Sequence, residues 1–103
     1  MEYIARHLNY TDKRIRKIAI TKGYDTQSIK LIEEMAELQQ AICKHRESKD
    51  KAKTLIGIKS EMADVYVMLE QMKYLMNISE EELEEIKEYK INRQLLRMNN
   101  EDM

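Results

Sequence analysis

The sequence contains no proline, only two glycines and a single cysteine in 103 residues. Proline and glycine are the residues that most strongly disfavour a helix interior, so their scarcity favours long helices over a loop-rich or all-β fold. The one cysteine, Cys43, excludes an intrachain disulfide and is typical of proteins from a reducing compartment. These absences together predict a helical protein of the cytoplasm.

Long apolar runs are also missing. No segment approaches the ~20 consecutive apolar residues that a membrane span needs, and residues 1–6 lack the apolar region of a signal peptide. The formal net charge of -1 argues against a domain that binds nucleic acid by bulk electrostatics. We therefore expect neither a membrane nor a nucleic acid as a partner.

What the sequence has in quantity is charge, at 36% of residues, interleaved with Leu, Ile and Met at helical spacing. The pattern predicts one all-α domain over residues 1–103 with its core at about 11–98. Thr11 is the expected N-cap of a helix that ends at Gly23, and Ser79 with Glu82 forms a capping box. The other helices are expected at about 26–46, 54–77 and 79–98.

The remaining segments are expected to be irregular. Residues 44–54 are polar throughout and predict a linker, either solvated or acting as a mobile lid. Residues 99–103 predict a frayed tail, and residues 1–10 leave a short helix and a loose arm equally open. Cys43 falls in the apolar stripe of its helix and is expected in the core.

Two acidic pairs stand out, Glu34/Glu37 and Glu61/Asp64, each with the i, i+3 spacing that places both carboxylates on one side of a helix. Glu34 and Glu37 fall on the polar side of their helix, where acids are ordinary. Glu61 falls within an apolar arc, and Asp64 lies at its edge. The arc consists of Ile58, Val65, Met68, Leu69, Met72 and Leu75. Ionised carboxylates in such a setting need a positive partner.

Carboxylates without a neighbouring histidine or cysteine form an all-oxygen site, which favours Mg²⁺ or Mn²⁺ over zinc or copper. Neither histidine follows a glutamate by three residues, as a di-iron bundle would require. Mg²⁺ commonly leaves positions for substrate phosphates. Lys90, Arg93 and Arg97 share one face of the last helix, with Lys87 adjacent, and could supply counter-charge to a polyphosphate.

These residues resemble a known signature. The sequence Glu33-Glu34-x-x-Glu37, then twenty-three residues, then Glu61-x-x-Asp64 is similar to the motif of the MazG-like all-α nucleoside triphosphate pyrophosphohydrolases, a group that includes dimeric dUTPases and dCTPases. The resemblance implies a four-helix MazG-like bundle, assembled as a homodimer or a dimer of dimers with the nucleotide near the subunit interface. It covers the chain from about residue 25 to residue 97.

The activity that the resemblance implies is cleavage of a (deoxy)nucleoside triphosphate between the α and β phosphates. The implied Mg²⁺ ligands, with Mn²⁺ as a possible substitute, are Glu34, Glu37, Glu61 and Asp64. Glu33 and Glu34 are the implied catalytic residues, and Glu33 would orient or deprotonate the attacking water, or else face solvent. The implied substrate contacts are Lys87, Lys90 and Arg93 for phosphates, and Asn92 and Gln27 for sugar or base.

A second subunit is also expected on independent grounds, because the helix at 54–77 is apolar nearly all round and three short helices cannot cover it. Two alternatives remain open. The chain could be a non-enzymatic helical interaction module whose acids pair with Lys30, Lys44 or Lys59. It could also be a family member that binds nucleotides without hydrolysing them. The sequence does not predict base or sugar specificity.

Overall fold

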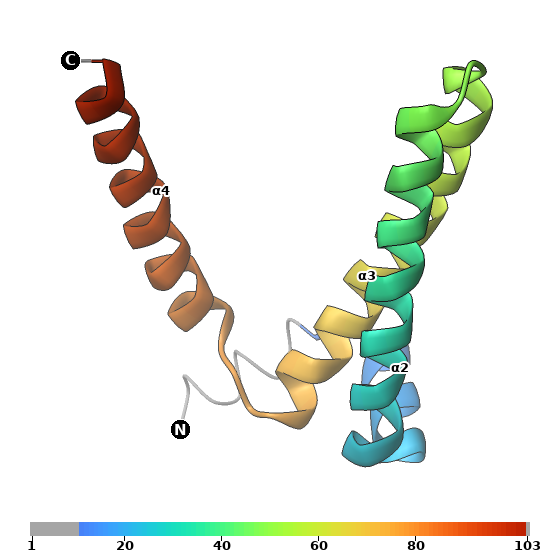
Figure 1. Ribbon diagram of the computed structural model, residues 1–103. Coiled ribbons are helices and arrows are strands. Elements are labelled where there is room, and N and C mark those ends of the chain that lie inside the picture. Colours follow the sequence, from blue (N-terminus) through green and yellow to red (C-terminus); the bar gives the residue numbers. More distant parts are fainter. Residues whose placement is uncertain (1–10, 103) are drawn as a thin grey trace.

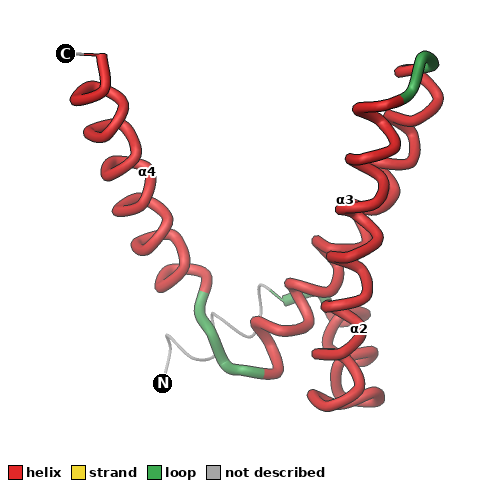
Figure 2. The backbone as a smooth tube through the Cα atoms, viewed as in Figure 1, coloured by secondary structure: helices red, strands yellow, loops and turns green. Residues whose placement is uncertain are grey.

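The computed structural model describes residues 11–102, which form three helices and no strand. Helix α2 spans Lys13–Glu47, α3 spans Lys51–Leu75 and α4 spans Glu80–Asp102. Helices α2 and α3 lie side by side, and α4 leads away from them on the far side of a turn, so the chain has the outline of a V (Figure 1). The loops between helices are short (Figure 2). The predicted all-α class is confirmed.

Helix α2 is two helical segments that meet at Gly23. Gly23 has φ 83 and ψ 166, which no helix accommodates and which glycine reaches without a Cβ penalty. The predicted break at this residue is therefore present. The N-cap, however, is Asp12 and not Thr11, since the Asp12 carboxylate accepts a hydrogen bond of 2.8 Å from the Arg14 backbone N–H and also pairs with the Arg14 guanidinium.

The connection between α2 and α3 consists of residues 48–50 only, shorter than the predicted linker over 44–54. The flanking lysines, glutamate and alanine are good helix formers and extend both helices. Asp50 caps α3 by accepting from the Lys53 backbone N–H at 3.1 Å, and the Lys51 ammonium donates to carbonyls at the end of α2. A turn this short makes the second segment of α2 and α3 antiparallel neighbours.

The seam between these antiparallel helices is narrow. Along α2 the residues shielded from solvent recur every three or four positions, at Gln27, Leu31, Glu34, Leu38, Ala41 and His45. Along α3 the same spacing joins Thr54, Ile58, Glu61, Val65, Met68, Met72 and Leu75, and Gln71, Lys73 and Tyr74 are also shielded near the end of this helix. This alternation of three and four is the spacing of two helices that interdigitate along a single stripe. The buried hydrophobic residues are few: Ala19, Val65, Met68 and Met72.

Two buried glutamines join the helices within this seam. Gln71 is 2% exposed and Gln27 is 6% exposed, and the Gln27 Nε2 donates to the Gln71 Oε1 at 2.7 Å. The Gln71 amide in turn lies 3.6 Å from the Met68 sulfur. Because each amide finds a partner, the pair can be buried without the full cost of desolvation.

Most of the apolar stripe predicted for α2 lies outside the seam. Ile29, Ile32 and Ile42 are 59%, 68% and 43% exposed, and Cys43 is exposed as well. The prediction that Cys43 lies in the core is therefore wrong for this subunit. The reason is that α3 packs against the stripe that contains Gln27 and Glu34, which leaves the more apolar stripe with no covering helix within residues 11–102.

The turn from α3 to α4 is held by local polar contacts. Ser79 is buried, and its hydroxyl accepts from the Glu82 backbone N–H at 3.0 Å, as the predicted capping box requires. Lys73 on α3 forms ion pairs with Glu70 and with Glu80, the first residue of α4. Burial lowers the pKa of Lys73, but the two carboxylates outweigh burial and raise it. Asn77, with φ 55, completes the turn.

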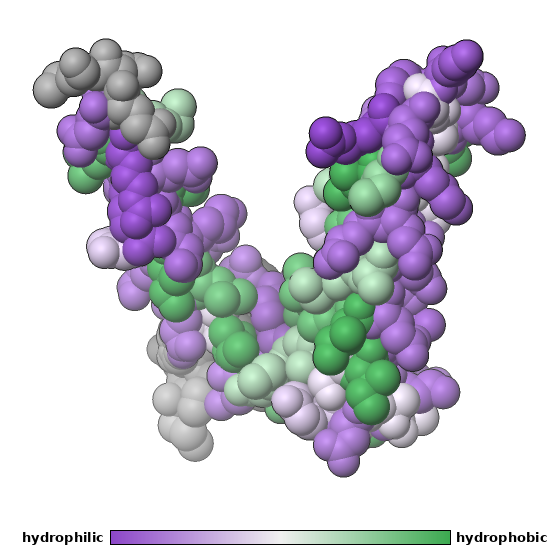
Figure 3. All heavy atoms as spheres, viewed as in Figure 1, coloured by the Kyte–Doolittle hydropathy of each residue, from purple (hydrophilic) through white to green (hydrophobic). Residues whose placement is uncertain are grey.

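Helix α4 makes no extensive contact with α2 or α3 beyond the turn that joins it to α3, and its residues 80–100 are all exposed. It remains helical to Asp102, so the predicted frayed tail at 99–103 is too long; no glycine or proline interrupts the segment. Apolar surface is visible on both arms of the V (Figure 3). On α4 the exposed large apolar residues are Leu83, Ile86, Tyr89, Ile91, Leu95, Leu96 and Met98. Residues 11–102 thus form three helices, of which only α2 and α3 pack together extensively.

None of the helices described here is long and apolar enough to cross a membrane.

Candidate metal centre

The α2·α3 seam brings three of the four predicted ligands together. Carboxylate oxygens of Glu34, Glu61 and Asp64 all lie within 4.8 Å of one another. Glu34 comes from α2 and the other two come from α3, one turn apart. The antiparallel pairing places the middle of α2 opposite the middle of α3, which is why acids twenty-seven residues apart in sequence converge.

Burial decreases across this acidic cluster. Glu34 is 7% exposed, Glu61 is intermediate and Asp64 is exposed. Sequence patterning places Glu61 among apolar residues, as the structure does, but it assigns Glu34 to a polar face. The signal that could have identified Glu34 is its spacing of seven from Gln27, which puts both residues on the stripe that faces α3.

Two oxygens in the cluster are buried without a hydrogen-bond partner, the Oε2 of Glu34 and the Oε2 of Glu61. The Glu34 side chain as a whole is 9% exposed. A buried carboxylate oxygen that accepts no hydrogen bond costs free energy, and the convergence of the three carboxylates adds charge repulsion. A cation bound between them would remove both penalties. This arrangement fits a metal site and does not resemble a solvated acidic face.

Lys30, one turn before Glu34, supplies positive charge to the cluster. Its Nζ lies 3.1 Å from the Glu34 Oε1 and 3.9 Å from the Glu33 Oε2. The hydrogen bond to Glu34 is the main reason that the pKa of Lys30 is raised. The Lys30 side chain is 49% exposed and that of Glu33 is 59% exposed, so both lie at the rim of the cluster.

Glu37 borders the cluster without joining the three converging carboxylates. It is exposed, yet the negative charges of Glu34, first, and of Glu61 raise its pKa. An acid whose pKa rises for this reason lies close to other acids and releases its proton less readily. Glu37 can therefore add a fourth carboxylate at the solvent side of the site.

The donor set consists of carboxylate oxygen, which suits hard divalent cations. Of the two histidines in the sequence, His45 is engaged elsewhere: its Nδ1 lies 2.8 Å from the Thr54 Oγ1 at the α2–α3 turn. His7 lies outside the described residues. The cluster can hold a metal ion through oxygen ligands alone.

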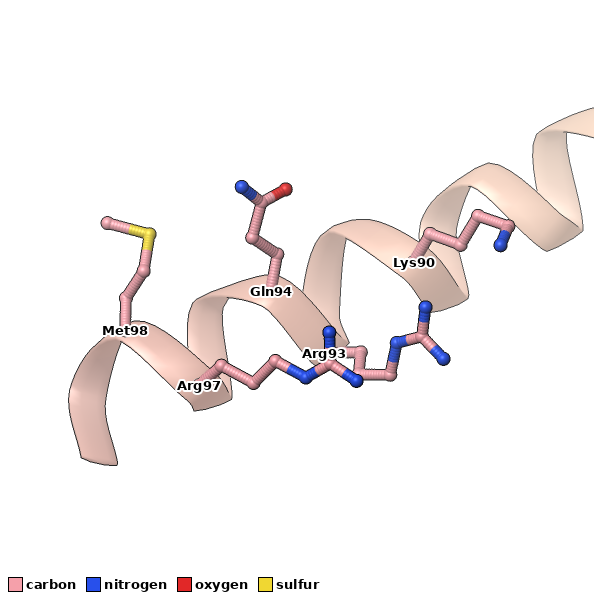
Figure 4. Close-up of a pocket in the computed structure, with 5 residues that line it drawn as sticks. All are labelled: Lys90, Arg93, Gln94, Arg97 and Met98. Atoms are coloured by element: carbon pink, nitrogen blue, oxygen red, sulfur yellow. The ribbon is translucent and has the colours of Figure 1, made fainter. Parts of the chain in front are cut away.

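The predicted phosphate-binding residues lie on α4 and are not brought to the acids. Figure 4 shows Lys90, Arg93 and Arg97 extending from one helix, and with Gln94 and Met98 they line a shallow pocket that only α4 residues form. The Arg93 guanidinium also lies 5.7 Å from the centre of the Tyr89 ring. Gln94 and Met98 are absent from the sequence-based site. With Lys90, Arg93 and Arg97 they follow the i, i+3, i+4, i+7, i+8 spacing of one helix face, so this spacing from the basic residues is the signal that could have identified them.

The other predicted substrate contacts are dispersed. The Lys87 Nζ lies 3.4 Å from the Glu84 Oε1 on its own helix, and Asn92 is exposed on α4. Gln27 is buried in the seam, where Gln71 holds its amide. Within one subunit, therefore, the acidic residues form a site and the basic residues form a separate surface.

Comparison of the chain with protein-family models, with curated proteins and with solved structures finds no match.

Proposed function

We propose that this protein is a Mg²⁺-dependent nucleoside triphosphate pyrophosphohydrolase of the MazG-like type, which converts a (d)NTP into the (d)NMP and pyrophosphate. The observation that supports the proposal is the convergence of Glu34, Glu61 and Asp64, with two buried oxygens that have no partner. The resemblance of the acidic motif to that superfamily supplies the reaction class. Mn²⁺ is expected to substitute for Mg²⁺, since both accept carboxylate oxygens.

Each acidic residue has a role in this proposal. Glu34, Glu61 and Asp64 hold the cation, and Glu37 completes the set from the solvent side. Such a cation supplies positive charge to the phosphates and acidifies the attacking water. Glu33 is exposed beside Glu34, where its carboxylate can accept the proton of that water. Water adds to the α-phosphorus, the bond to the bridging oxygen breaks, and pyrophosphate leaves.

The basic residues of α4 act on the triphosphate tail. Lys90 and Arg93 donate hydrogen bonds to β- and γ-phosphate oxygens, because charge-assisted bonds from guanidinium and ammonium groups suit phosphate. Lys87 has a weaker role, since Glu84 already pairs with it. Asn92 is exposed on the same helix and is a candidate contact for sugar or base.

A homodimer, or a dimer of dimers, would bring these two surfaces together. No helix within residues 11–102 covers α4. Exposed apolar residues line α4 and also the stripe of α2 that contains Ile29, Ile32 and Ile42. Contiguous exposed apolar residues commonly mark interaction surfaces. We propose that α4 of one subunit lies against α2 and α3 of another. The two segments of α2, together with α3 and this α4, would then form a four-helix bundle, and the cations of α4 would lie opposite the acidic cluster.

The reaction is tested by incubating the protein with a panel of nucleoside triphosphates and Mg²⁺, followed by identification of the products. The proposal expects monophosphate and pyrophosphate from at least one nucleotide, with loss of activity in EDTA. Release of orthophosphate and a diphosphate would contradict cleavage between the α and β phosphates. No turnover with any nucleotide, despite binding, would favour a nucleotide-binding protein without hydrolytic activity.

The shared site is tested by mixing two variants that should each have little activity at a substrate concentration below the wild-type KM. Glu61→Gln damages the acidic cluster, and the double substitution Lys90→Ala with Arg93→Ala damages the basic surface. If each site takes α4 from the partner, mixed dimers contain one intact site, and random mixing restores about a quarter of the activity. If both surfaces act within one subunit, the mixture gains no activity.

One observation favours a second candidate function. The apolar residues along α4 would equally suit a non-enzymatic module that binds a partner helix. This alternative explains α4 but leaves the partnerless oxygens of Glu34 and Glu61 without a purpose. Thermal denaturation separates the two functions, because a cation that binds the folded state raises the melting temperature and a pure interaction module gains nothing from it.

A further inference from the structure

Lys30 forms an ion pair with the most buried carboxylate of the cluster, that of Glu34. Within residues 11–102, the ion pairs that reach Glu34 come from this side chain alone. The contact occupies one oxygen of Glu34, the Oε1, at 3.1 Å, and leaves the Oε2 buried without a partner. One lysine thus offsets part of the negative charge of a cluster that contains at least three carboxylates.

The geometry of Lys30 also allows it to leave. Its side chain is 49% exposed, whereas that of Glu34 is 9% exposed. The ammonium can therefore rotate into solvent while the carboxylate stays in the seam. Lysine is suited to this because its charge sits at the end of a flexible four-carbon chain with no fixed fork geometry. The neighbouring Glu33, 3.9 Å away and 59% exposed, gives the released ammonium an alternative partner.

We infer that Lys30 is a displaceable internal counter-ion, which stabilises the acidic cluster before metal binding and competes with the divalent cation for Glu34. This inference rests on the cation site of the proposed function and adds a regulatory element to it. Lys30 lowers the affinity of the site for free cation, so that the site is loaded most effectively when a second interaction, such as the triphosphate, contributes to binding.

The competition can be measured on the full chain without nucleotide. Mn²⁺ binding to metal-free protein is followed by the electron paramagnetic resonance signal of free Mn²⁺, for wild type and for Lys30→Met. Methionine has a helix propensity close to that of lysine, so the substitution removes the charge and preserves the backbone. We expect Lys30→Met to bind Mn²⁺ about 2- to 5-fold more tightly, as for loss of a partly exposed ion pair.

Two matched variants separate specific competition from a general change in charge. Lys44→Met removes the same charge from the same helix, more than two turns from Glu34, and should bind Mn²⁺ as wild type does. Lys30→Arg keeps the charge and should remain close to wild type. In EDTA, Lys30→Met should melt at a lower temperature than Lys44→Met, because the cluster then lacks its counter-ion.

Equal Mn²⁺ affinity of wild type and Lys30→Met would overturn the inference, and so would weaker binding by Lys30→Met or the absence of Mn²⁺ binding by every variant. The proposed reaction fails separately. If the Lys30 variants behave as expected but no nucleotide is cleaved, the inference about Lys30 is supported and the proposed hydrolase reaction is contradicted. If nucleotides are cleaved and Lys30→Met binds Mn²⁺ as wild type does, only the inference that Lys30 competes with the cation is contradicted.

Discussion

The α2·α3 pair and α4 differ in both packing and charge. The pair buries a continuous seam that contains Glu34 and Glu61, whereas residues 80–100 of α4 are all exposed. The C-terminal half of α4 carries Lys90, Arg93 and Arg97 on one side. Most helical stability in proteins comes from packing of one amphipathic face, and α4 has no such packing within residues 11–102. This contrast is what motivates the proposal that α4 packs against a second subunit.

The largest expected effect lies in the seam. Glu61→Gln removes a proposed cation ligand whose Oε2 is buried without a partner, so turnover should fall by more than about 100-fold, given that even residues that only orient metal ligands cost 10- to 100-fold. In EDTA the same variant should melt at a higher temperature, since a buried charge is removed. Both are measured by pyrophosphate release and thermal denaturation.

The matched control is Glu47→Gln, which removes an exposed acid at the end of α2 and should leave turnover unchanged. Unchanged turnover in Glu61→Gln would remove this residue from the cation site.

The next effect concerns α4. Arg93→Ala should raise KM about 10-fold or more with little change in kcat, because a hydrogen bond to a charged group is lost. Arg46→Ala, an exposed arginine at the end of α2, serves as the control and should keep KM constant. Steady-state kinetics decides the matter. An unaltered KM in Arg93→Ala would show that the cationic side of α4 does not meet the phosphates.

A smaller effect tests how much the buried Gln27–Gln71 hydrogen bond contributes to the stability of the α2·α3 pair. Gln71→Leu leaves the buried Gln27 amide without its acceptor and should lower the free energy of unfolding by about 1–3 kcal/mol. The double variant Gln27→Leu/Gln71→Leu should recover much of this loss, since neither amide is then left unpaired. Denaturant unfolding measures both.

The same double variant addresses the predicted role of Gln27 in substrate binding. If Gln27 acts only in the seam, KM for the preferred nucleotide stays the same. A large rise in KM in a stably folded double variant would place Gln27 at the nucleotide instead.

The smallest effect is at the start of α2. The hydrogen bond and ion pair with Arg14 lower the pKa of Asp12 from 3.8 to about 2. Because the folded-state pKa is lowered, this contribution to stability is complete above the unfolded value and is lost as the pH falls from about 3.8 toward about 2. Asp12→Asn should flatten this part of the melting temperature profile. A profile identical to wild type would exclude Asp12 as its source.

Local sequence signals predicted those parts of the fold that local chemistry determines. Gly23 breaks α2 because only glycine reaches its φ cheaply, and Ser79 caps α4 through a contact three residues away. Cys43 and the ends of α3 and α4 were less predictable. Cys43 is exposed because no helix within residues 11–102 covers its stripe of α2. Which stripe is covered depends on the neighbouring helix, and the sequence of α2 alone does not encode it.

The spacing of the acids predicted the acidic cluster, but it did not predict that Glu34 is buried. Glu61 stands out because its neighbours in the arc are apolar. Glu34 does not, because the hydrophobicity of α2 peaks on a stripe that faces away from α3. Which stripe packs is decided by both helices together, through the buried Gln27–Gln71 pair and the short turn at residues 48–50. The periodicity of a single helix cannot predict which of its stripes will pack, because that depends on contacts between two helices.

The most direct test of the central claim is a crystal grown with Mn²⁺ and a nucleoside triphosphate analogue that resists hydrolysis, with data collected for anomalous scattering from manganese. The account predicts an anomalous peak between the carboxylates of Glu34, Glu61 and Asp64, with phosphate oxygens beside it. A peak elsewhere, or none at these carboxylates while the analogue is bound, would contradict it.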